Sequence, residues 1–241
     1  MTCAELVRNE HVRYCEGMAP EKSRRERPAK PALTRDGIVA TAVGILREEG
    51  LRKVTMRRLA QELDTGAASL YVYVRNAAEL HAAILDELLG TIPSPSSEGG
   101  WRDRLERLLT AYTSMLLEYP GLALSALVAR PSGENYLRLV EDLLALLAEG
   151  GVSAERRAWG IDILLQHATS TAAEHADQES PEDWDALARA VRDADETAYP
   201  QIAAHSADLL TGRPAQRMSW GLQVLITGIA DTAVPPERNQ T

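Results

Sequence analysis

The chain has 241 residues, of which 45% are hydrophobic, enough for a substantial core in one or two domains. Its net charge of −9 argues against a general polyanion-binding protein, and no run of 18 apolar residues is present that would predict a membrane span. Because alanine and leucine are abundant, phenylalanine is absent and no long alternating pattern occurs, the composition favours an all-α fold.

Residues 1–31 are polar and charged and end in two prolines, so we expect a disordered basic N-terminal arm. The basic run at residues 24–30 either contacts DNA or is a solubilising tail. Both cysteines, Cys3 and Cys15, lie in this arm, and no signal-peptide pattern is present. We therefore expect reduced thiols and a cytoplasmic protein.

Two helices are predicted between residues 34 and 63. Thr34 can cap the first helix, which ends at Gly50, a residue free to adopt positive φ. Thr55 can cap the second helix, whose apolar residues follow the spacing of one helical face. These inward residues are Met56, Leu59, Ala60 and Leu63.

A tight turn at residues 64–66 then leads into a third helix, Ala67–Val74. Asn76, with Glu79 three residues later, resembles a capping box at the start of a fourth helix. Two short helices joined by a tight turn form a helix-turn-helix, the motif that places one helix in the DNA major groove.

The third helix has an unusual outward face. Leu70 and Val74 are spaced i, i+4 and are predicted to point inward. The opposite side carries small, methyl-bearing and hydroxyl-bearing side chains, which suit close approach to base edges. A three-helix packing unit with no nucleic-acid role is the alternative. The outward residues are Ala68, Ser69, Val72 and Tyr73.

Charge is unevenly distributed along the chain. Residues 20–60 contain eleven Lys/Arg against five Asp/Glu, a net charge of +6, whereas residues 91–241 contain twelve against twenty-two, a net charge of −10. Cations beside the third helix are what phosphate contacts require. The cations near the start of the second helix are Arg52, Lys53, Arg57 and Arg58.

Residues 33–85 resemble the N-terminal domain of the tetracycline-repressor family of bacterial transcription regulators. The matching motifs are a first helix ending in Glu-Gly, a second helix of the form T-x-R-x-L-A-x-x-L, and a third helix with Leu-Tyr followed by an aromatic residue and Val. The resemblance implies a three-helix helix-turn-helix domain at residues 32–90. It also implies a C-terminal helical domain at residues 100–231 that binds a ligand and dimerises.

The resemblance also implies individual roles. Arg57 falls where the family contacts a base or phosphate, and Thr55 falls where the second helix faces a phosphate. The chain departs from the family pattern at Asp64, where the family usually has a turn glycine. It departs again at Ala77, where a phosphate-binding lysine is common, and Arg75 can supply the phosphate contact instead. A third departure is Tyr73, which stands where histidine is common. The predicted DNA-binding residues are Thr55, Arg57, Arg58, Ala68, Ser69, Tyr71, Val72, Tyr73 and Arg75.

The rest of the chain is divided into helices by Pro and Gly signals, after a breaker-rich linker at residues 91–100. Residues 177–195 contain Pro181 and many acidic residues, and we expect a mobile loop with one helical turn around Trp184. The helix beginning near Asp195 contains Pro200, so it is kinked or starts later. The other predicted helices are Trp101–Glu118, Leu122–Ala129, Asn135–Glu149, Ser153–His175 and Arg213–Ala230.

A small-molecule effector is expected among these helices, because polar and adaptable residues occur there within apolar stretches. Core residues with satisfied polar tips are the alternative. The predicted ligand-binding residues are Tyr112, Met115, Leu116, Tyr136, Val140, Ile163, Gln166, His167 and Ser170.

The resemblance further implies a homodimer in which the 153–175 helix and the last helix form a four-helix bundle with their mates. Small residues permit close helix approach, and two tryptophans supply area to bury. The alternative is that these faces pack within one subunit. The predicted interface residues are Trp159, Gly160, Leu164, Ala168, Trp220, Gly221, Leu225 and Gly228.

No enzyme motif is recognisable: the chain lacks a GxSxG elbow, a phosphate-binding loop, HExxH and a dinucleotide glycine fingerprint. His167, Glu174 and His175 are spaced too far apart for one metal ion, so we expect no metal and no cofactor. The sequence thus predicts a non-enzymatic, ligand-responsive regulator that binds double-stranded operator DNA. Repression is what the resemblance implies, and activation is the alternative. A helical adaptor with a helix-turn-helix fold but no operator is the competing function.

Overall fold

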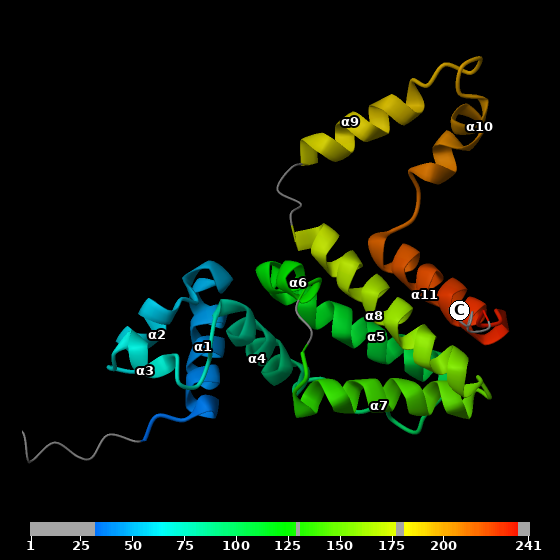
Figure 1. The fold of residues 1–241 in the computed structure, drawn as a ribbon. Coiled ribbons are helices and arrows are strands. Elements are labelled where there is room, and N and C mark those ends of the chain that lie inside the picture. Colours follow the sequence, from blue (N-terminus) through cyan, green and yellow to red (C-terminus); the bar gives the residue numbers. More distant parts are fainter. Residues whose placement is uncertain (1–31, 129–130, 177–180, 236–241) are drawn as a thin grey trace, which may run out of the picture. The chain divides into compact units, whose positions relative to one another are not determined.

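The computed structural model describes residues 32–128, 131–176 and 181–235, and every regular element in these ranges is a helix (Figure 1). The prediction of an all-α fold is therefore confirmed. Every helix described below lies in one compact unit, Thr34–Thr241. The predicted basic arm, with Cys3 and Cys15, lies outside the described residues.

Three of the first helices begin at side-chain caps. The hydroxyl of Thr34 accepts from the Gly37 N–H at 3.1 Å, the hydroxyl of Thr55 caps the second helix, and the amide oxygen of Asn76 caps the fourth. Because each cap satisfies an N–H without a helical partner, these starts are encoded locally. The elements are α1 (Arg35–Glu49), the 3₁₀ turn η2 (Leu51–Lys53), α2 (Met56–Glu62), α3 (Ala67–Leu70) and α4 (Ala77–Leu89).

The third helix is shorter than predicted, because α3 ends at Leu70 rather than Val74. The chain continues to wind as a turn, in which the N–H groups of Tyr73 and Val74 both donate to the Leu70 carbonyl at 3.0 Å. Leu70 and Val74 are fully buried, as predicted, and pack among the cores of the neighbouring helices. The predicted turn before α3 is also present, with Asp64 at φ 46°.

The long helix α8 is the centre of the remaining helices. It packs against α5, α6, α7 and α11, and α5 also contacts α7 and α11 (Figure 1). Burial of leucine side chains holds these contacts together. The elements are α5 (Trp101–Glu118), α6 (Pro120–Ala126), α7 (Glu134–Glu149), α8 (Ala154–Ala176) and α11 (Pro214–Asp231).

One prediction about prolines needs correction, and another is confirmed. The segment expected to be a mobile loop contains a 12-residue helix, α9 (Pro181–Arg192). Pro200 begins α10 (Pro200–Leu209), so the second alternative for that helix, a later start, is confirmed; Pro120 begins α6 in the same way. Proline is favourable in the first helical turn because its φ is preset and it lacks an N–H that would have no partner there.

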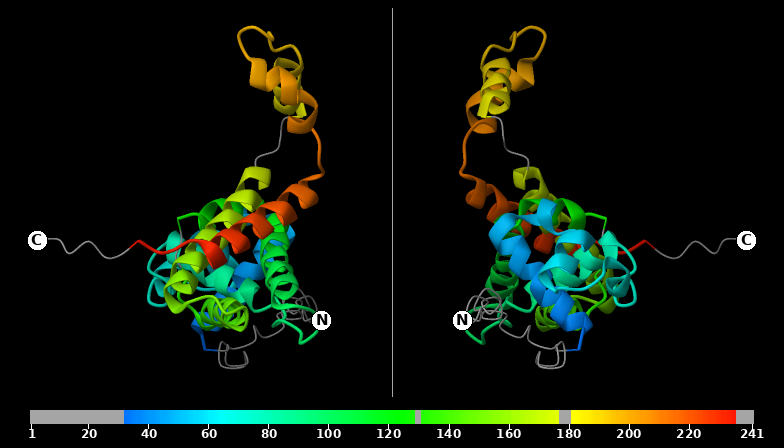
Figure 2. Two further views of the ribbon diagram at one scale, coloured as in Figure 1. Left: turned by 90° about the vertical axis from the view of Figure 1, so that its right-hand side faces the viewer. Right: turned by 90° about the vertical axis from the view of Figure 1, so that its left-hand side faces the viewer.

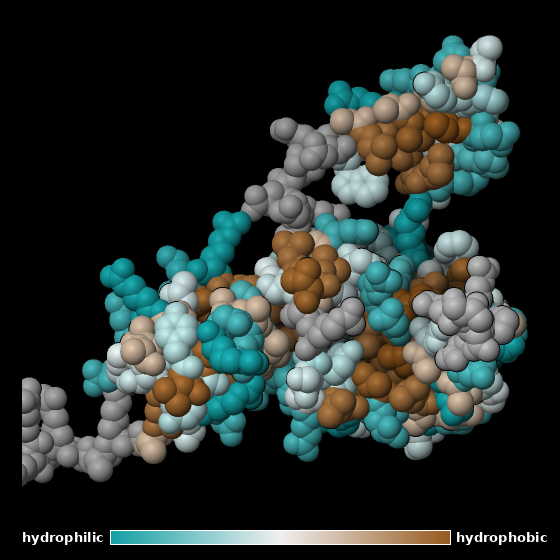
Figure 3. Space-filling view, viewed as in Figure 1, coloured by the Kyte–Doolittle hydropathy of each residue, from teal (hydrophilic) through white to brown (hydrophobic). Residues whose placement is uncertain are grey.

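The helices α9 and α10 pack against each other, as both views of Figure 2 show. Apolar side chains gather on this pair, seen in brown in Figure 3. Its exposed large apolar residues are Trp184, Leu187, Tyr199, Ile202 and Leu209.

Candidate functional site

The chain from Ala67 to Tyr73 presents its uncharged side to solvent. Tyr71, Val72 and Tyr73 are 51%, 81% and 36% exposed, and the small side chains of Ala68 and Ser69 are exposed as well. The predicted outward face therefore has the predicted orientation, with Leu70 and Val74 buried behind it. Such a surface offers methyl groups and hydroxyls with no charge of its own, which fits base edges in a groove.

A short turn holds this face beside α2. The N–H of Thr65 donates to the Ala60 carbonyl at 2.8 Å, and the N–H of Ser69 donates to the Gly66 carbonyl at 3.0 Å. Asp64, just before Thr65, is the one non-glycine residue with positive φ among the described residues, and it adopts the left-handed conformation. The predicted tolerance of aspartate at this glycine position is thus confirmed.

Two predicted DNA-binding residues lie on the first turn of α2. The hydroxyl oxygen of Thr55 accepts from the N–H of Arg58 at 3.1 Å, which leaves its own O–H available to donate. Arg57 is exposed and adjoins this cap. This arrangement can supply a neutral and a charged donor to a phosphate beside α3.

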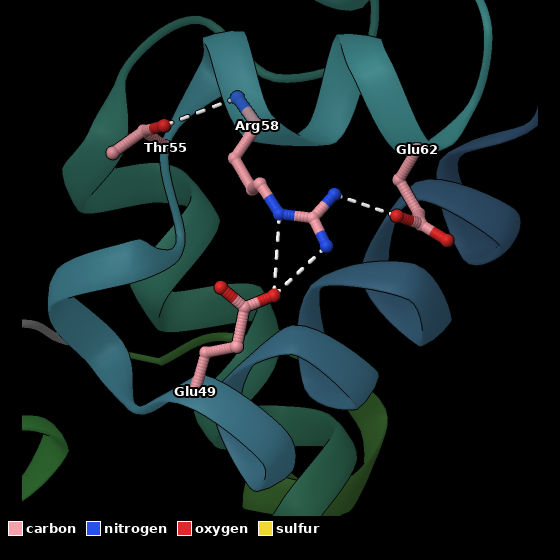
Figure 4. A network of polar contacts seen from close by, with 4 residues as sticks. All are labelled: Glu49, Thr55, Arg58 and Glu62. Carbon is pink, nitrogen blue, oxygen red and sulfur yellow. Dashed lines mark hydrogen bonds and ion pairs between the residues drawn. The ribbon is translucent and has the colours of Figure 1, made fainter.

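Arg58, in contrast, forms ion pairs with two carboxylates of its own chain (Figure 4). Its guanidinium lies 2.8 Å from the carboxylate of Glu49, at the end of α1, and 2.6 Å from that of Glu62 in α2. These hydrogen bonds, to Glu62 first and then Glu49, raise the pKa of Arg58. Because both edges of the guanidinium are occupied, Arg58 ties α2 to α1 in this structure.

Arg75 extends into solvent before α4, with 84% of its side chain exposed. Its Nε lies 2.9 Å from the Glu79 carboxylate, which also accepts from the Arg75 N–H at 2.9 Å. These two hydrogen bonds lower the pKa of Glu79, the backbone one contributing most. The guanidinium is thus held by one edge near α3, a placement consistent with the phosphate role expected where Ala77 replaces lysine.

The candidate effector region centres on Tyr112 of α5. Tyr112 is buried, and its hydroxyl lies 2.8 Å from that of Thr169 in α8. Burial raises the pKa of Tyr112, although the hydrogen bond to Thr169 opposes this shift. Thr169 was missed by sequence reasoning, although it shares a face of α8 with Leu165 and Ala172 at helical spacing.

The other predicted ligand residues divide into two groups. Met115 and Leu116 are buried beside Tyr112, while Tyr136 and Val140 on α7 and His167 and Ser170 on α8 are half-buried. Ile163 and Gln166 are exposed on the outer face of α8, so they do not belong with this group. Of the polar tips, the Ser170 hydroxyl donates to its own helix, and His167 Nε2 is buried with no hydrogen-bond partner among the described residues.

The predicted dimer residues also divide. Gly160, Leu164 and Ala168 are buried inside the protomer, and a methyl group at Gly160 would lie 2.7 Å from Ile229 of α11. Gly160 therefore lets α8 and α11 pack closely within one chain, as the alternative interpretation expects. Leu225 and Gly221 are half-buried, and Gly228 is exposed.

The tryptophans, by contrast, face outward. Trp159 is 56% exposed on α8 and Trp220 is 69% exposed on α11. One helical turn further along each helix lie Ile163 and Val224, also exposed. We call these four residues the tryptophan stripe. Its i, i+4 spacing is readable from the sequence, although Ile163 was assigned to the ligand and Val224 was not selected.

None of the described helices is long and apolar enough to cross a membrane.

Comparison with known proteins matches residues 93–233 to the family description "Tetracyclin repressor-like, C-terminal domain". The chain is 33% identical over 226 residues to an HTH-type transcriptional regulator of Saccharopolyspora erythraea, and the match covers 89% of this chain and 90% of that protein.

Solved structures show the same relationship. A transcription regulator from Streptomyces coelicolor is 56% identical, superposes with a TM-score of 0.76, and matches 87% of this chain and all of that one. The same organism's ActR, in complex with actinorhodin, is 33% identical with a TM-score of 0.74, covering 82% of this chain and 97% of that one. The chain described here therefore belongs to the tetracycline-repressor family of helix-turn-helix transcriptional regulators.

Proposed function

We propose that this regulator binds a two-fold symmetric operator as a homodimer and leaves it when a small molecule binds among α5, α7 and α8. It acts in the cytoplasm as a repressor and carries out no catalysis. The observation that supports this most strongly is the exposed, uncharged face at residues 67–73, mounted on buried Leu70 and Val74. The groups needed for base contact are on the outside, and the groups needed for packing are on the inside.

Base reading is assigned to this face and phosphate binding to its flanks. Val72 can meet a thymine methyl group, and the hydroxyls of Tyr71 and Tyr73 can bond bases or phosphates. Arg57 on α2 and Arg75, which follows the face in the chain, are exposed cations that can reach phosphates. The remaining proposed contacts are Thr55, Ala68 and Ser69.

A search of a random-sequence duplex pool tests this function. The regulator should enrich one inverted repeat, and its affinity for that repeat should fall steeply as salt rises, because bound phosphates release counterions. A helical adaptor, the competing function, would enrich no sequence and would leave no footprint of two equal half-sites.

The homodimer is assigned to the tryptophan stripe. Large apolar side chains rarely stand together in solvent, and helix-turn-helix proteins use two-fold symmetry to read two half-sites about 34–36 Å apart. Trp220→Asp should convert the dimer to monomer in sedimentation velocity, because it would bury an unpaired charge in the interface. Val72→Asp, an equally drastic change on the DNA face, is the control and should remain dimeric.

The effector is proposed to contact Tyr112, Met115 and Leu116 on α5, Tyr136 and Val140 on α7, and Ser170 and His167 on α8. Around Tyr112 the buried polar side chains, Thr113 and Thr169, are uncharged, which favours an uncharged organic molecule with hydroxyl or carbonyl groups. The related ActR has been solved with actinorhodin and with (S)-DNPA, which supports an organic small molecule as the effector.

Actinorhodin is accordingly the probe for the effector site. If it releases the selected duplex, Tyr112→Ala should raise the concentration needed while leaving duplex affinity without actinorhodin unchanged. Ser114→Ala, an exposed position on the same helix, should alter neither quantity. A parallel loss of duplex affinity in Tyr112→Ala would indicate a folding defect instead.

A further inference from the structure

Helices α4 and α7 each supply a side chain that hydrogen-bonds to the backbone at the end of the other helix. Helix α7 begins after Gly133, which has no side chain to cap the free N–H groups of the first turn. The missing acceptor comes from α4, where Asp86 Oδ1 accepts from the N–H of Tyr136 at 2.9 Å. The first turn of α7 is therefore capped by a residue 50 positions earlier in the chain.

The reverse contact comes from Arg138, one turn into α7. Its Nη2 donates to the carbonyl of Leu89, at the end of α4, at 3.1 Å and to that of Ile92 at 3.4 Å. A carboxylate thus lies at the positive end of one helix and a guanidinium at the negative end of the other. Both placements are favourable to the helix dipoles and satisfy backbone groups that otherwise have no helical partner.

Gly133 is required for this arrangement. A methyl group placed there would overlap the carboxylate of Asp86. The glycine therefore allows the α4 side chain to reach the first turn of α7, and any larger residue would displace it.

The same turn of α7 also belongs to the proposed effector site. Tyr136 is half-buried on α7, and α7 packs against both α5 and α8, the other helices of that site. The backbone N–H of Tyr136 is the group that Asp86 holds. The first turn of α7 therefore joins α4 to a helix of the proposed effector site.

We infer that Asp86 and Arg138 are positioning residues that link α4 to the first turn of α7, so that movement of Tyr136 changes the position of α4. This inference rests on the proposed function and specifies its route. Because coupling between two sites is reciprocal, fixing α4 on DNA must also change the stability of the Tyr136 cap.

Hydrogen exchange of the full-length protein at the Tyr136 amide, with and without the selected duplex, measures this link directly. In the wild type, duplex binding should change the exchange rate by about fivefold or more, the lower range of coupling between linked sites. In Asp86→Ala the amide should exchange faster and should not respond to the duplex. Asp86→Asn, which keeps an acceptor oxygen, should restore part of the response.

Gly133→Ala displaces Asp86 without altering it and should reproduce the loss. Arg138→Gln should weaken the response. Arg156→Gln is the matched control, since Arg156 caps the end of α11 through the Ala230 carbonyl, away from α4, and its loss should leave the response unchanged. Basal exchange alone would change for a purely structural cap, whereas the response to DNA would not.

Two results would overturn the inference: a wild-type amide indifferent to bound duplex, or an Asp86→Ala variant that binds duplex and responds as the wild type does. If no duplex is selected at all, it is the DNA-binding function that fails, which separates the two proposals.

Discussion

The two regions of this regulator define their helices by different means. In the DNA-binding region, α1, α2 and α4 each begin at a Thr or Asn whose side chain caps the first turn. In the C-terminal region, α5, α6, α7 and α10 begin with no side-chain cap bond from the preceding residue. Local side-chain caps therefore specify the starts of α1, α2 and α4, whereas these four C-terminal helices depend more on packing between distant segments.

This comparison predicts that core truncation will be most damaging around α5 and α8. Leu109 lies on α5 and is fully buried among the C-terminal helices. Leu109→Ala should lower the free energy of unfolding by about 2–5 kcal/mol, because it removes apolar contact and leaves a cavity. Denaturant unfolding measures this, and Leu117→Ala, an exposed leucine on the same helix, should cost far less.

The neighbouring residues Arg57 and Arg58 should respond differently to substitution. Arg57→Ala should weaken operator binding by about 1–3 kcal/mol, with little effect on stability, because it removes an exposed DNA contact. Arg58→Ala should instead lower the midpoint of thermal unfolding slightly, since it breaks the partly exposed ion pairs with Glu49 and Glu62. Gel shift and thermal unfolding of both variants distinguish these roles, and equal operator affinity of Arg57→Ala and wild type would remove Arg57 from the interface.

Caps should matter in the first region by a smaller amount. Thr55→Ala removes the acceptor for the Arg58 N–H and should destabilise the protein by about 0.5–2 kcal/mol. Thr55→Ser keeps the hydroxyl and should recover most of the loss in denaturant unfolding. If alanine and serine behave alike, this cap does not specify the start of α2.

The smallest predicted effect concerns pH. Hydrogen bonds from the Arg75 backbone and side chain hold the pKa of Glu79 below its usual 4.5. Because the folded-state pKa is lowered, the stabilisation is present above pH 4.5 and is lost as pH falls through the lower, folded-state value. NMR titration of the Glu79 carboxyl should show this depressed pKa, and Arg75→Gln should raise it while leaving the backbone contribution in place.

Sequence patterns anticipated what local chemistry dictates. Thr34, Thr55 and Asn76 were identified as caps, and the outward face of residues 67–73 followed from the spacing of Leu70 and Val74. The same reasoning could not separate Arg57 from Arg58, because the partners of Arg58 include Glu49 on another helix. It also placed Leu164 at a dimer interface, although in this structure that residue is buried within the protomer.

The positions that sequence patterns could not place share one cause: they depend on which helix packs against which. Gly160 was chosen for close approach between helices, and it does permit one, but with Ile229 of its own chain. Thr169 and Asp86 were overlooked because their partners, Tyr112 and Tyr136, are 57 and 50 residues away. Helical periodicity reports which face is apolar, and it carries no information about the neighbour that covers that face.

Comparing the DNA sequences selected by the wild type and by Val72→Ala tests the central assignment most directly. Val72 is the most exposed large apolar side chain on the face formed by residues 67–73. If this face reads base edges, the variant should relax the preference at one position of each half-site, by about 1–3 kcal/mol, and leave the others unchanged. Identical preferences for the two proteins, or no enriched sequence for either, would contradict the assignment.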